Sequence, residues 1–210
     1  PPSPEPHLHA AALRLVDRYG EWFSTPTIHR LLLDSHRRLA ARASIHAHLP
    51  ILAERLTRER LEGLARSEGH LPTGVPHVLF VCGRNTGRSQ LAAAILAHRA
   101  GDRVRVSSAG TDPAPAPAPE VLRSLAEVGI EAEAAFPRPL TEEVIGAADV
   151  VVTMGCVDAC PVLPGRRYLN WPLPAPEGAP PHVVRAVRNA VTAHVEELLP
   201  SLLPTPTGGR

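Results

Sequence analysis

The sequence predicts an α/β domain, with a parallel sheet covered by helices, that follows a small all-helical domain. From about residue 73 onward, short apolar runs alternate with helical patterns, and this alternation is typical of a parallel sheet. The preceding segment contains helical patterns and no strand pattern. We therefore expect two domains, a helical one at residues 1–72 and an α/β one at residues 73–210.

Three helices are expected in the first domain from the spacing of their apolar residues. The first covers residues 9–20. In the second, at residues 24–43, Ser24 or Thr25 is placed to cap the N-terminus and Pro26 stands in the first turn. The third, at residues 49–69, brings its leucines roughly onto one side. The sequence HLPTGVP then indicates a linker.

Strands and helices alternate in the second domain. Strands are expected at the apolar runs 77–81, 104–109 and 149–154. Helices are expected at residues 89–99, 119–129 and 181–199, and another is expected to begin near Thr141. Because ligands in such sheets bind beyond the carboxyl ends of the strands, the loop after the first strand is the expected site.

Composition limits the classes of function. The 44% hydrophobic fraction is enough for a buried core, and the +1 net charge comes with 22 basic residues that are all arginine, without a basic block for nucleic acid. No apolar run is long enough to cross a bilayer and no signal peptide opens the chain, so we expect a cytoplasmic protein without a membrane partner. Three cysteines, Cys82, Cys156 and Cys160, suit a reducing compartment and thiol chemistry.

The sequence CGRNTGRS, residues 82–89, carries the chemistry expected at that loop. Its glycines allow backbone N–H groups to point inward and form an anion cradle, and the dipole of the following helix adds positive charge that favours a thiolate. Arg88 is able to bind two oxygens of a tetrahedral oxyanion. The candidate oxyanion-binding residues are Gly83, Arg84, Asn85, Thr86, Gly87, Arg88 and Ser89.

Other interpretations of these residues explain less. A buried structural cysteine does not account for the glycines and the arginine. A nucleotide P-loop requires wider glycine spacing and a lysine, and the dinucleotide fingerprint is absent. A zinc site at CVDAC lacks a second ligand pair, and the 11 histidines are mostly upstream and scattered, so we expect no metal.

The run from Cys82 to Ser89 fits the C-x5-R-[ST] loop of the low-molecular-weight protein tyrosine phosphatases. Together with SSAGTDP and VVTMGCVDACPVLPGRRYLNWPLP, it resembles the arsenate reductases built on that fold, over residues 76–200. The resemblance implies a four-stranded parallel sheet with helices on both faces. It also implies that Cys82 is the nucleophile, that Arg88 and the loop amides bind the oxyanion, that Asn85 holds the loop and that Ser89 donates to the thiolate.

The resemblance to the reductases further implies a relay of three cysteines without a cofactor. Cys82 would attack arsenate, Cys156 would attack the sulfur of that adduct and release arsenite, and Cys160 would then pair with Cys156. A thioredoxin-type dithiol would reduce the final disulfide. A three-helix extension, which some of these reductases carry, implies a homodimer.

One departure from the family pattern affects the proton donor. Where the family has Trp-Asp-Leu-Pro-Asp-Pro, this chain has WPLPAP, so Pro172 and Ala175 replace both carboxylates. Asp158, Glu177 or water are the alternatives for proton delivery, and a missing general acid slows the chemical step. Two other functions remain open at this point: a tyrosine phosphatase, and a non-catalytic oxyanion-sensing module.

Overall fold

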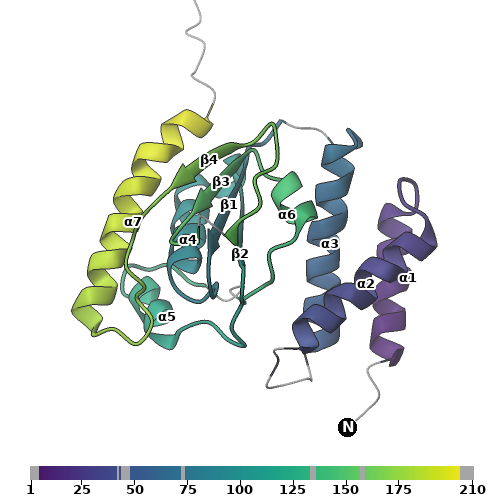
Figure 1. The fold of residues 1–210 in the computed structure, drawn as a ribbon, viewed down its shortest axis with the longest axis horizontal. Helices are drawn as coiled ribbons and strands as arrows, with labels where there is room; N and C mark the ends of the chain where they lie inside the picture. The colour runs from purple at the N-terminus through teal and green to yellow at the C-terminus, as the bar shows by residue number, and fades with distance from the viewer. Residues whose placement is uncertain are drawn as a thin grey trace, which may run out of the picture. The chain divides into compact units, whose positions relative to one another are not determined.

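The computed structural model describes residues 5–41, 43, 48–71, 74–132, 136–156 and 159–203 (Figure 1). The chain divides into two compact units. The first comprises Pro1–Pro72 with Thr141–Ala147, and the second comprises Thr73–Leu140 with Ala148–Arg210. That residues 1–72 and 73–210 are separate domains stays a prediction, and the predicted linker at residues 70–76 lies partly outside the described residues.

The first unit contains the three predicted helices, α1 (Glu5–Tyr19), α2 (Thr25–Ala40) and α3 (Leu49–Ser67). Ser24 is the cap of α2, because its hydroxyl accepts a hydrogen bond of 3.3 Å from the backbone N–H of Thr27. Each helix turns an apolar stripe inward, and the buried side chains include Leu15, Ile28, Leu32, Leu56 and Leu61.

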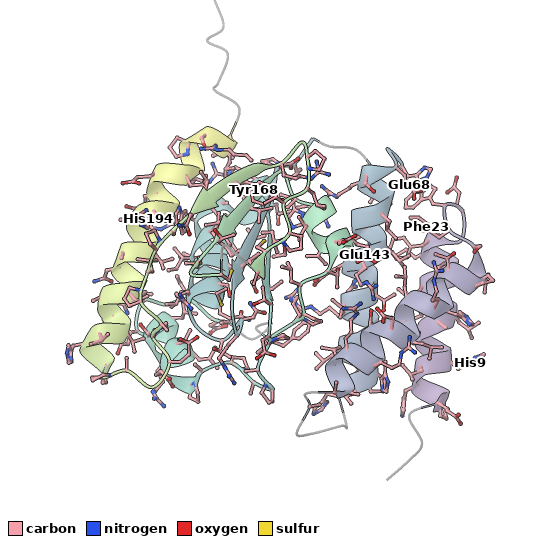
Figure 2. The ribbon with its side chains drawn as sticks, in the orientation of Figure 1. His9, Phe23, Glu68, Glu143, Tyr168 and His194 are labelled. Atoms are coloured by element: carbon pink, nitrogen blue, oxygen red, sulfur yellow. The ribbon has the colours of Figure 1, made fainter. Side chains whose placement is uncertain are left out.

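A short helix from later in the chain, α6 (Glu142–Gly146), belongs to the same unit. It begins after Thr141, as predicted, but spans only five residues. Gly63 of α3 allows the close approach, since a β-carbon there would overlap the carbonyl oxygen of Glu143. The buried Arg60 then donates from Nη1 to Asp34 at 2.8 Å and from Nη2 to Glu143 at 3.0 Å, which ties α2, α3 and α6 together; Figure 2 labels Glu143.

The second unit is built on a four-stranded parallel sheet, which confirms the predicted fold class. The strands are β1 (His77–Cys82), β2 (Arg105–Gly110), β3 (Val150–Thr153) and β4 (Arg167–Asn170), in the order β2-β1-β3-β4. The first three match the predicted apolar runs to within a residue or two. The residues of β4 were not predicted from the apolar pattern, because this edge strand is partly exposed and has arginine and asparagine at its ends.

Helices α4 (Arg88–Ala100), α5 (Pro119–Ala126) and α7 (Pro181–Leu202) belong to this unit, as does a short 3₁₀ helix at Gly101–Arg103 (Figure 1). Helix α5 ends three residues earlier than predicted. Alternate residues of the central strands pack into one core with these helices, among them Val78, Phe80, Val152, Leu91 and Val191. Leu79, Val81 and Val151 point to the opposite face and are fully buried, so both faces of the sheet are covered.

None of the described helices is both long and apolar enough to cross a membrane.

Candidate active site

The site lies at the edge of the sheet where the parallel strands end. Cys82 is the last residue of β1 and pairs in register with Gly110, the last residue of β2. Thr153 ends β3 beside Asn170, which ends β4. The segments after these four strands therefore emerge at one edge, where open parallel sheets bind their ligands.

The C-x5-R loop, residues 82–88, presents its carbonyl groups outward. Six consecutive carbonyl oxygens, from Cys82 to Gly87, accept hydrogen bonds of 2.8 to 3.3 Å. The donors are the side chain of Gln90 and the backbone N–H groups of Leu91, Thr111, Asp112, Ala114 and Ala118. Because a trans peptide points its N–H away from its carbonyl, and no described peptide is cis, the N–H groups of residues 83–88 face the inside of the loop.

Asn85 fixes the shape of this loop. It has a φ of +52°, which is uncommon outside glycine and is tolerated best by asparagine and aspartate. Its Oδ1 accepts a 2.9 Å hydrogen bond from the backbone N–H of Arg138, and its Nδ2 donates at 2.8 Å to Ser89 Oγ. These two hydrogen bonds orient the side-chain amide of Asn85. They hold the residue in its left-handed backbone conformation through both the oxygen and the nitrogen of that amide.

The sulfur of Cys82 receives hydrogen bonds in this arrangement. Cys82 is fully buried, and the backbone N–H of Asn85 donates to its Sγ at 3.2 Å. Ser89 Oγ lies 3.0 Å from Sγ and already accepts from Asn85 Nδ2, which leaves its hydroxyl hydrogen for the sulfur. Two donors directed at one sulfur atom stabilise a thiolate.

Arg88 lies between two other segments at this edge. Its Nη1 donates at 3.2 Å to the carbonyl of Leu173, and the same atom occupies the space in which a β-carbon on Gly155 would stand. Gly155 also has a φ of +80°. Arg88 Nε is buried and has no hydrogen-bond partner among the described residues, so the guanidinium keeps donor capacity for an anion.

The other two thiols are arranged differently. Cys156 Sγ donates at 3.3 Å to the carbonyl of Val81, the residue that precedes Cys82. Burial raises the pKa of the Cys156 thiol, and the neighbouring Cys82 raises it further. Burial, followed by the neighbouring Cys156, also raises the pKa of Cys160 to about 11. Cys156 and Cys160 are therefore protonated thiols at neutral pH.

The segment after Cys160 is fastened to β4. Tyr168, labelled in Figure 2, accepts a 2.8 Å hydrogen bond from the N–H of Leu163. Its hydroxyl then donates to the carbonyl of Pro161 at 3.3 Å. Between these two residues, Val162 is 75% exposed. The result is an apolar, exposed turn next to the third cysteine.

The structure brings together most of the predicted site residues but gives two of them other contacts. Arg84 has an exposed side chain, so it joins the loop through its backbone. Thr86 donates its hydroxyl hydrogen to Glu177 Oε1 at 2.7 Å, so this hydrogen is already paired. Asp158, one alternative for proton delivery, lies outside the described residues.

Several contributors were not found from the sequence. Gln90 directly follows the C-x5-R-[ST] motif and donates to the Asn85 carbonyl. Arg138, Leu173 and Gly155 support the loop or Arg88 from distant positions in the chain. The described residues contain no group of three His, Cys, Asp or Glu side chains that is placed to hold a metal ion.

Comparisons with known proteins agree with this geometry. Residues 77–165 match the low molecular weight phosphotyrosine protein phosphatase family, and residues 8–65 match the N-terminal domain of protein-tyrosine-phosphatase-like proteins. A putative arsenate reductase of Halobacterium salinarum is 31% identical over 135 residues, which are 60% of this chain and 92% of that protein. The chain belongs to the low molecular weight phosphatase family. The resemblance inferred from the C-x5-R loop is thereby confirmed.

Solved structures of this family show the same fold. A thioredoxin-dependent arsenate reductase from Corynebacterium glutamicum is 42% identical, with a TM-score of 0.87 over 95% of this chain and 98% of that one. An arginine phosphatase from Geobacillus stearothermophilus is 29% identical, with a TM-score of 0.54 over 60% of this chain and 92% of that one. The family therefore includes both reductases and phosphatases as relatives of this chain.

Proposed function

We propose that the protein reduces arsenate to arsenite, with Cys82 as the nucleophile and Cys156 and Cys160 as the thiols that follow it. The observation that carries the proposal is the contrast among the three sulfurs at one edge of the sheet. Cys82 receives hydrogen bonds, whereas Cys156 donates one to the residue next to Cys82. Hydrolysis through a phosphocysteine needs one thiol, but a two-electron reduction needs a second thiol.

In the first step the Cys82 thiolate attacks arsenic. The S–As bond forms, one As–O bond breaks, and the departing oxygen leaves as water. Arg88 and the inward N–H groups of residues 83–88 bind the remaining oxygens, and these donors are in place before the substrate arrives. Ser89 and the backbone N–H of Asn85 direct hydrogen bonds at the attacking sulfur.

In the second step Cys156, once deprotonated, attacks Cys82 Sγ. An S–S bond forms, the S–As bond breaks, and its electron pair stays on arsenic, which is reduced from As(V) to As(III) and leaves as arsenite. Two thiols are oxidised to one disulfide, so the electrons balance. The raised pKa of Cys156 keeps this thiol from competing for arsenate in the first step.

In the third step Cys160 attacks Cys156 and expels Cys82 as a thiolate. The leaving sulfur is the one that Asn85 and Ser89 stabilise, which favours this direction of exchange. The Cys156–Cys160 disulfide is then reduced by an external dithiol protein of the thioredoxin type. The exposed, apolar turn around Val162 suits the approach of such a partner, and the related reductase from Corynebacterium glutamicum is thioredoxin-dependent.

We also propose that the protein is a cytoplasmic homodimer that associates through its first unit. Each of the three long helices of this unit exposes a large apolar side chain: Leu13 at 58%, Leu33 at 53% and Ile51 at 67%. Helical bundles of this size bury little apolar surface alone, so a second copy would add stability. Light scattering of the full chain tests this arrangement, since a monomer at micromolar concentration contradicts it.

Phosphatase activity is the second candidate function, because a phosphatase is among the relatives and the C-x5-R loop serves both reactions. Steady-state assays separate the two functions. Incubation with arsenate, a dithiol protein and its reductase should consume reductant in proportion to arsenite formed. Hydrolysis of an aryl phosphate without any consumption of reductant from arsenate would favour the phosphatase, and arsenate binding without either reaction would favour a sensor.

A further inference from the structure

Glu177 is seated directly on the C-x5-R loop. It belongs to the segment of residues 171–178 that follows β4, called the strap here. Thr86 Oγ1 donates to Glu177 Oε1 at 2.7 Å. A β-carbon on Gly87 would lie 2.5 Å from the same oxygen and 2.7 Å from the carboxyl carbon, so the absence of a side chain at residue 87 makes room for the carboxyl group.

One oxygen of this carboxyl group has no partner. Glu177 Oε2 is buried and has no hydrogen-bond partner in the part of the chain that the structure describes. Arg88 Nε, at the end of the same loop, is likewise buried and has no hydrogen-bond partner among the described residues. A buried acceptor and a buried donor without partners, both on the rim of one anion-binding loop, are groups that a bound ligand satisfies.

The reaction needs a group that moves a proton at this place. When sulfur displaces an oxygen from arsenate, that oxygen departs as water only if a proton reaches it. Arg88 does not release a proton at physiological pH, and Pro172 and Ala175 in the strap have no titratable side chain. Glu177 is the strap residue whose carboxyl group contacts the loop.

We propose that Glu177 is a catalytic residue that binds the protonated form of arsenate through Oε2 and carries a proton between two of its oxygens. This proposal rests on the proposed reduction of arsenate. Singly charged arsenate bears two hydroxyl groups. One of them donates to Oε2, and its proton passes through the carboxyl group to the other, which leaves as water. The singly charged thiolate and the singly charged arsenate thus give one water and a doubly charged adduct, in which arsenic is bonded to sulfur and three oxygens, so atoms and charge balance.

The carboxylate also sets which ionic form of the substrate is bound. Doubly charged arsenate presents fewer hydroxyl hydrogens, and its oxygens repel the carboxylate at Oε2. The singly charged form presents a hydroxyl that matches the unpaired acceptor, while its ionised oxygen suits Arg88. Glu177 therefore favours binding of singly charged arsenate, which carries the proton that the departing oxygen needs in order to leave as water.

Two variants separate a catalytic role of Glu177 from a purely structural one. Glu177→Gln still accepts from Thr86 but carries no proton. Glu120→Gln is the matched control, because Glu120 accepts a 2.6 Å hydrogen bond from the N–H of Gly178 in the strap and makes no such bond with the C-x5-R loop.

The experiment measures the rate of arsenite release in a single turnover of the full chain without reductant. Glu177→Gln should be slower by about 10²-fold, the lower end of the range for lost general acid–base catalysis. Glu120→Gln should stay close to the wild-type rate. Thermal unfolding midpoints of all variants should match the wild type, which shows that the fold is kept.

A binding measurement gives a second readout that a structural role would not change. Affinity of the wild type for inorganic phosphate should fall from mildly acidic to mildly alkaline pH, and it should fall less in Glu177→Gln. Wild-type speed in Glu177→Gln, or an equal loss in Glu120→Gln, would overturn the role of Glu177. If the wild type itself releases no arsenite, the proposed function fails instead.

Discussion

The C-x5-R loop and the segment that carries the cysteine pair end neighbouring strands of one sheet, yet they prepare their sulfurs in opposite ways. Cys82 receives hydrogen bonds from Asn85 and Ser89, and the loop around it is held through six carbonyl groups. Cys156 donates to a carbonyl, and burial raises the pKa of its thiol. At the same edge of the sheet, hydrogen-bond donors thus face the sulfur of Cys82, whereas a hydrogen-bond acceptor faces the sulfur of Cys156.

The difference follows from local backbone geometry. Residues 83–88 turn their N–H groups inward, so a negative sulfur finds donors. Cys156 instead donates its thiol hydrogen to the carbonyl of Val81, a bond that a thiol makes and a thiolate does not. The proposed relay needs this asymmetry because its thiols react in order. Cys82 attacks arsenate first, Cys156 reacts only with the arsenic adduct, and Cys160 reacts only with the resulting disulfide.

The largest effect is expected from Cys82→Ser. This variant should lose all arsenate turnover, because a serine hydroxyl at this position is a far weaker nucleophile than a thiolate. It should still bind inorganic phosphate in calorimetry, since the cradle consists of backbone N–H groups and Arg88. Arsenite formation by Cys82→Ser would contradict the role given to the loop.

Removal of the Cys160 thiol should stop the reaction after the Cys82–Cys156 disulfide has formed. Cys160→Ser should complete one turnover and accumulate a disulfide between Cys82 and Cys156, which peptide mapping identifies. Continued turnover with a thioredoxin system in Cys156→Ala would show instead that an external thiol attacks the arsenic adduct. In that case the difference between the surroundings of Cys82 and those of Cys156 has no role in catalysis.

A matched pair of glycines tests how the cysteine-pair segment holds Arg88. Gly155 and Gly165 have φ values of +80° and +77°, so alanine strains both backbones equally. Only Gly155→Ala also collides with Arg88 Nη1, since nothing lies within 4 Å of a β-carbon on Gly165. Phosphate affinity should fall about 10- to 100-fold in Gly155→Ala, the cost of a displaced charged hydrogen bond, and little in Gly165→Ala. Equal losses in both variants would assign the effect to strain.

The smallest effect concerns pH. Burial raises the pKa of Cys160. This cause remains when Cys156 is held in a disulfide, so the thiolate fraction of Cys160 rises about tenfold for each pH unit below its pKa. The conversion of the Cys82–Cys156 disulfide into the Cys156–Cys160 disulfide should accelerate accordingly between neutral and alkaline pH. Quenched-flow mapping of the two disulfides measures this rate, and a flat profile would show that Cys160 is activated by another group.

The features that the sequence predicted well are local ones. The C-x5-R loop lies between a buried strand and a helix, and its glycines, Asn85 and Ser89 are close neighbours in the chain, so motif and geometry coincide. The Ser24 cap was visible for the same reason. The apolar pattern did not give β4, because an edge strand is not apolar throughout.

Contacts between residues that are far apart in the chain could not be predicted from the sequence pattern. Thr86 and Glu177 are 91 positions apart, and nothing near Thr86 in the sequence indicates that its hydroxyl donates to a carboxyl group. The contact between Arg88 and Gly155 depends on the order of β1 and β3 in the sheet, which a local pattern does not specify. Glu177 was an alternative for proton delivery from its position in the chain, and its contact with the loop required the structure.

A single turnover of the reduced protein with excess arsenate and no reductant tests the account most directly. We expect one arsenite per chain, together with one disulfide that peptide mapping assigns to Cys156 and Cys160, while Cys82 returns to a free thiol. Arsenate that remains unreduced while all three thiols stay free would contradict the assignment of these sulfurs to a reductive relay.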